Sequence, residues 1–226
     1  MSDVTLSAMF GDFPVTQAFK RGDFARPGIN IAMTDVPEAH KLFPSVVRDR
    51  AFDVAELSIM TYLIAKSRGV ALTLLPAVLL ARFQHPYIVY NRQCGQLGPK
   101  DLEGRRVGIR SVTVTTVTWV RGMLVNEFDV DLDRVKWVTF EDAHVAGVSD
   151  PPSAQRAEAG KTLVGMLSDG ELDAAIVGAP VDHPDIVPLF ADPAAAATDW
   201  HKAHGAIQVN HMVVARNEAL DAHPDA

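Results

Sequence analysis

An arginine and a histidine stand three residues apart, directly after a strongly apolar run. Arg82 and His85 follow residues 71–80 and precede Pro86. Arginine can hold a carboxylate through two parallel hydrogen bonds, and a histidine side chain can donate or accept a proton near neutral pH. The pair therefore indicates binding of an organic acid with proton transfer. The alternative is a surface arginine and a loop histidine.

Glu56 and His211 are two further groups that could move protons. Glu56 comes near the end of a predicted strand (52–57), and open α/β sheets bind ligands at the C-terminal ends of strands. It could act as a base or accept from a phenolic hydroxyl; the alternatives are a salt bridge or a hinge hydrogen bond. His211 lies inside the apolar strand 208–215. It is either a core histidine with satisfied hydrogen bonds or a ligand-facing acid.

Hydroxyl side chains gather where two predicted helices begin. Ser58 precedes a helix over 59–67, and Thr113, Thr115 and Thr116 precede or begin the next long helix. Helix N-termini offer N–H groups to anions, so these residues could bind carboxylate or phenol oxygens. The alternative is simple N-capping. Gly178 follows a predicted strand at 173–177, where a glycine allows close backbone approach to a ligand.

A metal site remains an alternative because Glu56, His85 and His211 are oxygen and nitrogen donors. Their spacing matches no known metal motif, and no GxSxG, P-loop or GxGxxG sequence occurs. We therefore expect neither a metal nor an organic cofactor. We expect Arg121, on the helix after the threonines, to form a structural ion pair.

The composition excludes several classes of protein. The chain has 226 residues, a net charge of −7 and a single cysteine, Cys94. An acidic balance argues against nucleic acid or anionic membranes as partners, and one cysteine excludes an internal disulfide. The apolar run at 69–81 is too short for a membrane span and contains Pro76. The first residues lack the features of a signal peptide, so we expect a cytoplasmic protein.

Short β-rich runs alternate with helical stretches along the chain. Strands are predicted at 5–10, 29–34, 52–57, 71–80, 87–90, 106–109, 135–140, 173–177, 186–190 and 208–215. Helices are predicted at 37–50 with a kink at Pro44, at 59–67, after Thr116, at 157–167, at 193–204 and from Glu218 onward. This order predicts an α/β architecture with largely parallel sheets.

Five stretches, taken in order, resemble one family. They are FDVAELSIMTYLIA (52–65), LPAVLLARFQHPYIVYNR (75–92), the long run 102–138 with its WVRG element, DGELDAAIVG (169–178) and VNHMVVARNEALDAHP (209–224). The chain resembles the 4,5-dihydroxyphthalate decarboxylases and related proteins over nearly its whole length. It departs from their pattern at Gln84, where a second arginine is usual, and at Thr115–Thr116, where Thr-Ala is usual.

The resemblance implies the type II periplasmic-binding-protein fold, in which two α/β lobes enclose a ligand cleft. We expect residues 1–94 and 191–226 to form lobe 1, continuing past Ala226, and residues 95–190 to form lobe 2. The implied activity is non-oxidative decarboxylation of a hydroxylated aromatic carboxylate, with a small aromatic acid as partner. The alternative is a solute-binding protein of an ABC-type transporter for a small organic anion. The oligomeric state, monomer or homo-oligomer, stays open.

Overall fold

The computed structural model describes residues 4–23, 26–36 and 38–224, which form two compact units. Unit 1 comprises Met1–Ala81, His144–Gly147 and Val209–Ala226, and unit 2 comprises Arg82–Ala143 and Val148–Gln208. The chain therefore passes between the units four times. The predicted lobe boundaries lie at 94/95 and 190/191, whereas the corresponding boundaries between the two units lie at 81/82 and 208/209. The segment after Ala81 joins unit 2 because its strand pairs within the sheet of that unit.

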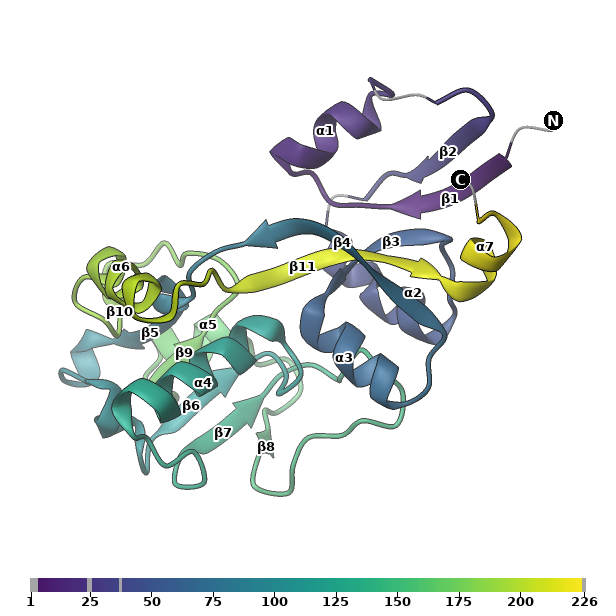
Figure 1. The fold of residues 1–226 in the computed structure, drawn as a ribbon. Coiled ribbons are helices and arrows are strands. Elements are labelled where there is room, and N and C mark those ends of the chain that lie inside the picture. The colour runs from purple at the N-terminus through teal and green to yellow at the C-terminus, as the bar shows by residue number, and fades with distance from the viewer. Residues whose placement is uncertain (1–3, 24–25, 37, 225–226) are drawn as a thin grey trace. The chain divides into compact units, whose positions relative to one another are not determined.

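Unit 1 is built on a five-stranded sheet with the order β2-β1-β3-β11-β4 (Figure 1). β1 pairs in parallel with β2 and β3, and β11 runs antiparallel to both β3 and β4. The strands are β1 (Val4–Met9), β2 (Ile29–Thr34), β3 (Val54–Ser58), β4 (Leu72–Ala81) and β11 (Val209–Arg216). The helices of this unit are α1 (Pro14–Lys20), α2 (Phe43–Arg48), α3 (Ile59–Ser67), α7 (Asn217–Ala222) and the short 3₁₀ turn η1 (Ala39–Leu42).

A partly buried carboxylate, that of Asp53, joins three of these strands. The backbone N–H and the hydroxyl of Ser7, on β1, both donate to Oδ2 of Asp53 at 2.8 Å, and Arg216 at the end of β11 pairs with Oδ1. Burial alone would raise the pKa of Asp53, but the hydrogen bonds from Ser7 and Arg216 outweigh it and lower that pKa. The contact fixes β11 beside β3, which is the pairing that assembles the candidate site described below.

The helix predicted at 37–50 is interrupted earlier than expected. Pro37 lies outside the described residues; η1 and α2 follow one another, and Pro44 stands in the first turn of α2. Proline suits that position because the first N–H groups of a helix have no intrahelical partner. Phe43, Val46 and Val47 of α2 are buried, so this helix packs its apolar side against the unit 1 sheet.

Unit 2 is built on a six-stranded sheet with the order β10-β5-β9-β6-β7-β8. Its strands are β5 (Ile88–Asn91), β6 (Arg106–Ile109), β7 (Lys136–Thr139), β8 (Gln155–Arg156), β9 (Ala174–Ile176) and β10 (Ile186–Pro188). Its helices are α4 (Thr115–Phe128), α5 (Leu163–Ser168) and α6 (Pro193–His204), with the 3₁₀ turns η2 (His85–Tyr87), η3 (Arg92–Cys94) and η4 (Pro99–Leu102).

Alternate residues of these strands pack into two separate cores. Ile88 and Ile176 face the core formed with α4 and α6, whereas their neighbours Val89 and Ala175 face the core formed with α5. This alternation follows from the two-residue period of a strand. Unit 2 is therefore a sheet with helices on both faces, as Figure 1 shows for α4 and α5.

The predicted α/β fold class is confirmed, although both sheets are mixed rather than largely parallel. In the unit 1 sheet β11 runs antiparallel to β3 and β4, and in the unit 2 sheet β5 runs antiparallel to β10 and β9. The helix expected at 157–167 begins only at Leu163, because Gly160 has a φ of 86° and Thr162 caps the helix by accepting from Gly165 N–H. Among the described residues no helix is long and apolar enough to cross a membrane.

Candidate functional site

Glu56 and His211 meet in unit 1 across the β3–β11 ladder. Ser58 stands opposite His211, and Glu56 stands opposite Val213, so the side chains of Glu56 and His211 share one face of the sheet. Diagonal neighbours of this kind are within reach when their side chains are long. Oε1 of Glu56 lies 2.5 Å from Nδ1 of His211. The carboxylate is 1% exposed and the imidazole 19% exposed, so the pair has a buried end and an accessible end.

The second carboxylate oxygen of Glu56 is also engaged. The backbone N–H of Gly11 donates to Oε2 at 2.7 Å. With both oxygens acting as acceptors, the proton between Glu56 and His211 belongs on Nδ1, which leaves Nε2 of His211 as the reactive nitrogen. The rings of Phe13 and Phe43 meet His211 edge to face, at centroid distances of 6.5 and 5.2 Å, and restrict the imidazole's orientation.

Ser58 caps α3, as one of the two sequence interpretations predicted. Its Oγ accepts from Thr61 N–H at 3.4 Å and donates to Thr61 Oγ1 at 2.7 Å. The side chain is buried, at 5% exposure. The capping prediction is confirmed, and a contact between Ser58 and a bound anion stays a prediction.

His144 joins this part of unit 1, although the sequence analysis did not single it out. Its Nδ1 lies 2.9 Å from Oγ1 of Thr61, and its ring meets Phe43 edge to face at 5.7 Å. Phe43 therefore contacts two imidazoles, His144 and His211. No local motif marks His144, because it lies in an irregular loop after β7.

In unit 2, Arg82 is held by two contacts. Its Nη2 donates to the backbone carbonyl of Gly178 at 2.7 Å, and its guanidinium carbon lies 3.8 Å from the centre of the Tyr87 ring. Burial lowers the pKa of Arg82 below its usual range, which the nearby Tyr87 hydroxyl partly offsets. The structure thus brings together Arg82 and Gly178, two of the residues predicted from sequence. A carboxylate-binding role for either stays a prediction.

His85 is enclosed by aromatic side chains in the same unit. It is 3% exposed, and its ring lies 5.4 Å from that of Phe190 and 6.4 Å from that of Phe83. Its buried Nδ1 has no hydrogen-bond partner among the described residues. Burial lowers the pKa of His85, with a smaller opposing effect from the charge of Glu127. The surroundings therefore favour the neutral imidazole.

The threonine cluster lies where α4 begins. Thr113, Thr115 and Thr116 are buried, and Thr113 Oγ1 lies 3.0 Å from Ser111 Oγ. Val114 occupies the N-cap position and provides no side-chain cap, so the hydroxyls do not cap α4 in the way expected of one alternative. Anion binding by these threonines stays a prediction.

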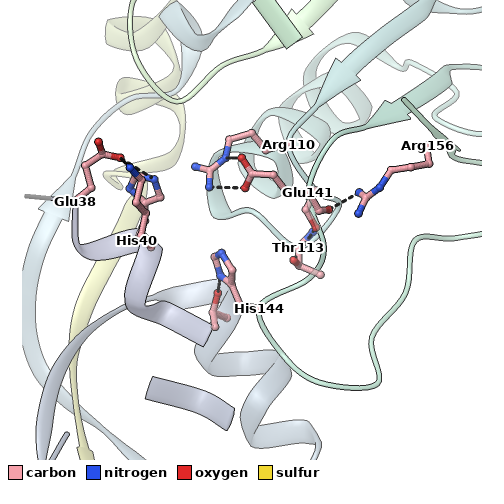
Figure 2. A network of polar contacts seen from close by, with 10 residues as sticks. Glu38, His40, Arg110, Thr113, Glu141, His144 and Arg156 are labelled. Atoms are coloured by element: carbon pink, nitrogen blue, oxygen red, sulfur yellow. Dashed lines mark hydrogen bonds and ion pairs between the residues drawn. The ribbon is translucent and has the colours of Figure 1, made fainter. Parts of the chain in front are cut away.

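Two arginines donate hydrogen bonds to Glu141, one to its carboxylate and one to its backbone carbonyl. The guanidinium of Arg110 donates to both carboxylate oxygens of Glu141, at 2.9 and 2.7 Å, and Arg156 donates to the Glu141 backbone carbonyl at 2.6 Å (Figure 2). Arg121 does not form the ion pair expected from sequence within the described part of the chain. Its guanidinium lies 5.3 Å from the Trp137 ring, and burial lowers its pKa.

No group of three potential metal ligands occurs among residues 4–23, 26–36 and 38–224. Glu56 and His211 form a pair in unit 1, but His85 belongs to unit 2 and packs against aromatic rings. The donor set considered from sequence therefore does not assemble within either unit. The expectation that the protein uses no cofactor stays a prediction.

Two curated proteins match the chain over most of its length. A 4,5-dihydroxyphthalate decarboxylase of Comamonas testosteroni is 28% identical over 238 aligned residues, which cover 99% of this chain and 72% of that protein. One from Pseudomonas putida is 29% identical, with 90% of this chain and 83% of that protein covered. The chain is similar to 4,5-dihydroxyphthalate decarboxylases. A comparison with protein-family models gives no match.

The likeness to these decarboxylases confirms the resemblance predicted from sequence, and solved structures confirm the fold. The aliphatic sulphonate binding protein of Escherichia coli matches with a TM-score of 0.59 at 10% identity, covering 99% of this chain and 68% of that one. The alkanesulfonate-binding protein of Xanthomonas axonopodis, bound to MOPS, matches with 0.55 at 10% identity, covering 98% and 68%. A Candida albicans protein described as having the generic periplasmic-binding-protein fold matches with 0.53 at 12% identity, covering 98% and 66%.

Proposed function

We propose that this protein removes one carboxylate, without oxidation, from a hydroxylated aromatic acid such as 4,5-dihydroxyphthalate. The observation that carries the proposal is the likeness to two decarboxylases over 99% and 90% of the chain. The Glu56–His211 pair supports it, because a partly accessible imidazole held by a buried carboxylate is a proton-transfer device.

The reaction requires few groups. A ring hydroxyl para to a carboxylate loses its proton and pushes electrons toward the ring carbon that bears that carboxylate. This carbon takes up a proton, its bond to the carboxylate breaks, and CO2 leaves while the ring regains aromaticity. The bonding electrons stay with the ring, and the hydroxyl is reprotonated from water. Catalysis therefore depends on a proton acceptor at the hydroxyl and on groups that bind the substrate's charges.

We assign the proton acceptor to Nε2 of His211. Glu56 holds Nδ1–H, so Nε2 carries the lone pair that a phenolic hydroxyl can meet. Glu56 itself is a positioning residue, because both of its oxygens are already engaged by Gly11 and His211. His85 suits proton donation less well, since burial disfavours its cationic form.

Arg82 remains the candidate for holding a substrate carboxylate. A guanidinium has five N–H donors, and one of those of Arg82 is used by Gly178 O. Its contact with Tyr87 fixes the plane of the fork, which preorganises the remaining Nη donors for a carboxylate.

The test is direct. The purified protein is incubated with 4,5-dihydroxyphthalate, and CO2 and protocatechuate are measured. We expect stoichiometric formation of both and a loss of about 100-fold or more in kcat for His211→Gln. His223→Gln, at the end of α7, is the matched control and should leave kcat unchanged. No product with any hydroxylated phthalate or benzoate would refute the proposal.

A second candidate function rests on the structural comparisons. Two of the solved structures named in the preceding subsection are those of proteins that bind sulfonates, so a solute receptor for a small organic anion would also use this architecture. It predicts tight binding of an aromatic acid, measured by calorimetry, with no CO2 released over many hours.

A further inference from the structure

A small polar pocket lies in unit 2, on the side of the sheet that α5 covers. Strands β6, β7 and β8, the loop before α5 and α5 itself form its walls. Its cavity volume is about 60 Å³, which corresponds to about four ordered waters or a molecule of about five heavy atoms. The charged and amide side chains that line it are those of Arg106, Gln155, Arg156, Glu158, Lys161 and Glu171.

Strand geometry directs two of the donor side chains toward this pocket. Arg106 lies two residues before Gly108, whose Cβ position meets Leu172 in the core under α5, and alternate residues of a strand share a face. Gln155 is the register partner of Val138, another residue of that core, and register partners point to the same side of a sheet. The guanidinium of Arg106 and the amide of Gln155 therefore both lie on the side of the sheet that holds the pocket.

Neither of these donors has a partner among residues 4–23, 26–36 and 38–224. The backbone N–H of Arg106 donates to Asp173 Oδ2 at 2.9 Å, but in that part of the chain no hydrogen bond or ion pair engages its guanidinium. The side-chain amide of Gln155 is likewise unengaged there. An unpaired cation and an unused amide donor in one pocket indicate a ligand with oxygen acceptors.

The remaining charges of the pocket leave Arg106 as the dominant one. Lys161 Nζ lies 2.5 Å from Glu171 Oε1, so these two neutralise each other, and Arg156 pairs with aspartates outside the pocket. Glu158 has no ion pair within the described part of the chain, but it is exposed, whereas Arg106 is partly buried. Water and salt screen an exposed charge more strongly, so the balance favours an anion at Arg106.

We propose that this pocket binds a small oxyanion, of the class of inorganic phosphate or bicarbonate, through the Arg106 guanidinium and the Gln155 amide. Arg106 is the first residue of β6, whereas the threonine cluster considered for the aromatic acid follows the last residue of that strand, so the two lie at opposite ends of β6. The inference therefore goes beyond the proposed function and does not depend on it.

NMR of the unmodified protein tests the site without any need for turnover. The protein is titrated with inorganic phosphate or with bicarbonate, and with sodium chloride at matched ionic strength. We expect the Nε–H signal of Arg106 and the side-chain amide signals of Gln155 to shift in a saturable manner with an oxyanion and to stay in place with chloride. The oxyanion that saturates the shift at the lower concentration is the ligand. No saturable shift with either oxyanion, or an equal shift with chloride, would overturn the proposal.

Calorimetry of variants then locates the anion. Arg106→Gln should lower the affinity at least about tenfold, and Gln155→Ala, on the short exposed strand β8, should lower it by a smaller factor and tests the site should Arg106→Gln not fold. Arg105→Gln is the matched control, because it removes the same charge from a guanidinium that pairs with Asp173 and does not line the pocket. Glu158→Gln removes a negative charge and should tighten binding. Weaker binding in Glu158→Gln, or equal affinities in the two arginine variants, would overturn the proposal.

Discussion

The backbone nitrogen of Gly11 lies 2.7 Å from Oε2 of Glu56, and a Cβ at position 11 would lie only 2.9 Å from the same oxygen. Real Cβ atoms essentially never approach another atom so closely, so a side chain at position 11 would force the Glu56 carboxylate to shift from the place where it accepts from this N–H. The added carbon would also lie 3.1 Å from the Phe13 ring. Glycine at position 11 thus fixes the carboxylate that orients His211.

Replacing Gly11 by alanine should displace the Glu56 carboxylate and release His211 from its orientation. We expect kcat to fall about 10-fold to 100-fold and the free energy of unfolding to fall by about 1–3 kcal/mol. Enzyme kinetics and chemical denaturation measure the two effects. Gly122→Ala is the control, since nothing lies within 4 Å of its Cβ position in α4, and it should stabilise the helix slightly. An unchanged kcat in Gly11→Ala would show that Glu56 does not position His211.

Glu56→Gln should lower kcat by more than the loss of one negative charge would explain. Gly11 N–H and His211 Nδ1–H both need acceptors, and glutamine has one carbonyl oxygen to offer them. Either a buried N–H loses its acceptor, or His211 changes tautomer and Nε2 no longer accepts. We expect kcat to fall at least about 100-fold with KM little changed. Glu127→Gln removes the partner of His204 in unit 2 and serves as the matched control; equal losses in the two variants would contradict the assignment.

The local parts of this site could be predicted from sequence, and the long-range parts could not. Ser58 and α3 were predicted because capping depends on neighbouring residues, and the structure confirms both. The contact between Glu56 and His211 depends on β3 and β11 pairing across 155 residues, which no local pattern specifies. Gly11 and His144 were missed for the same reason, since each acts through a residue distant in sequence.

The differences between the predicted and the observed secondary structure have both local and non-local causes. The run at 157–167 has helical periodicity, but the left-handed backbone at Gly160 and the Thr162 cap delay the helix to Leu163. The mixed strand directions follow from sheet order, which alternating elements alone do not determine.

Arg82→Lys separates a structural role of Arg82 from a binding role. Lysine keeps the charge but loses the planar fork that spans Gly178 O and the Tyr87 ring. We expect the free energy of unfolding to fall by about 1–2 kcal/mol, and to fall little further when Tyr87→Leu is added, because the two residues share one contact. Chemical denaturation of the single and double variants measures this. An effect confined to KM, with stability unchanged, would instead assign Arg82 to the substrate alone.

His85 should make the protein sensitive to mild acid. Burial lowers the pKa of His85 in the folded protein, whereas an unfolded chain has an ordinary histidine pKa of about 6.5. The unfolded state therefore takes up the proton first as the pH falls. The free energy of unfolding should decrease as the pH drops below about 6.5, and it should recover when the pH is raised again. The negative charge of Glu127 opposes this shift without cancelling it.

His85→Phe should remove that dependence. Phenylalanine fits among Phe83 and Phe190 and eliminates an Nδ1 that has no partner among the described residues, so stability at pH 8 should change by less than about 1.5 kcal/mol. Denaturation at pH 8, 7, 6 and 5.5 should show a shallower loss of stability in His85→Phe than in the unmodified protein or His223→Gln. Retained turnover in His85→Phe would leave His211 as the proton-transferring residue, whereas abolished turnover with normal stability would return that role to His85.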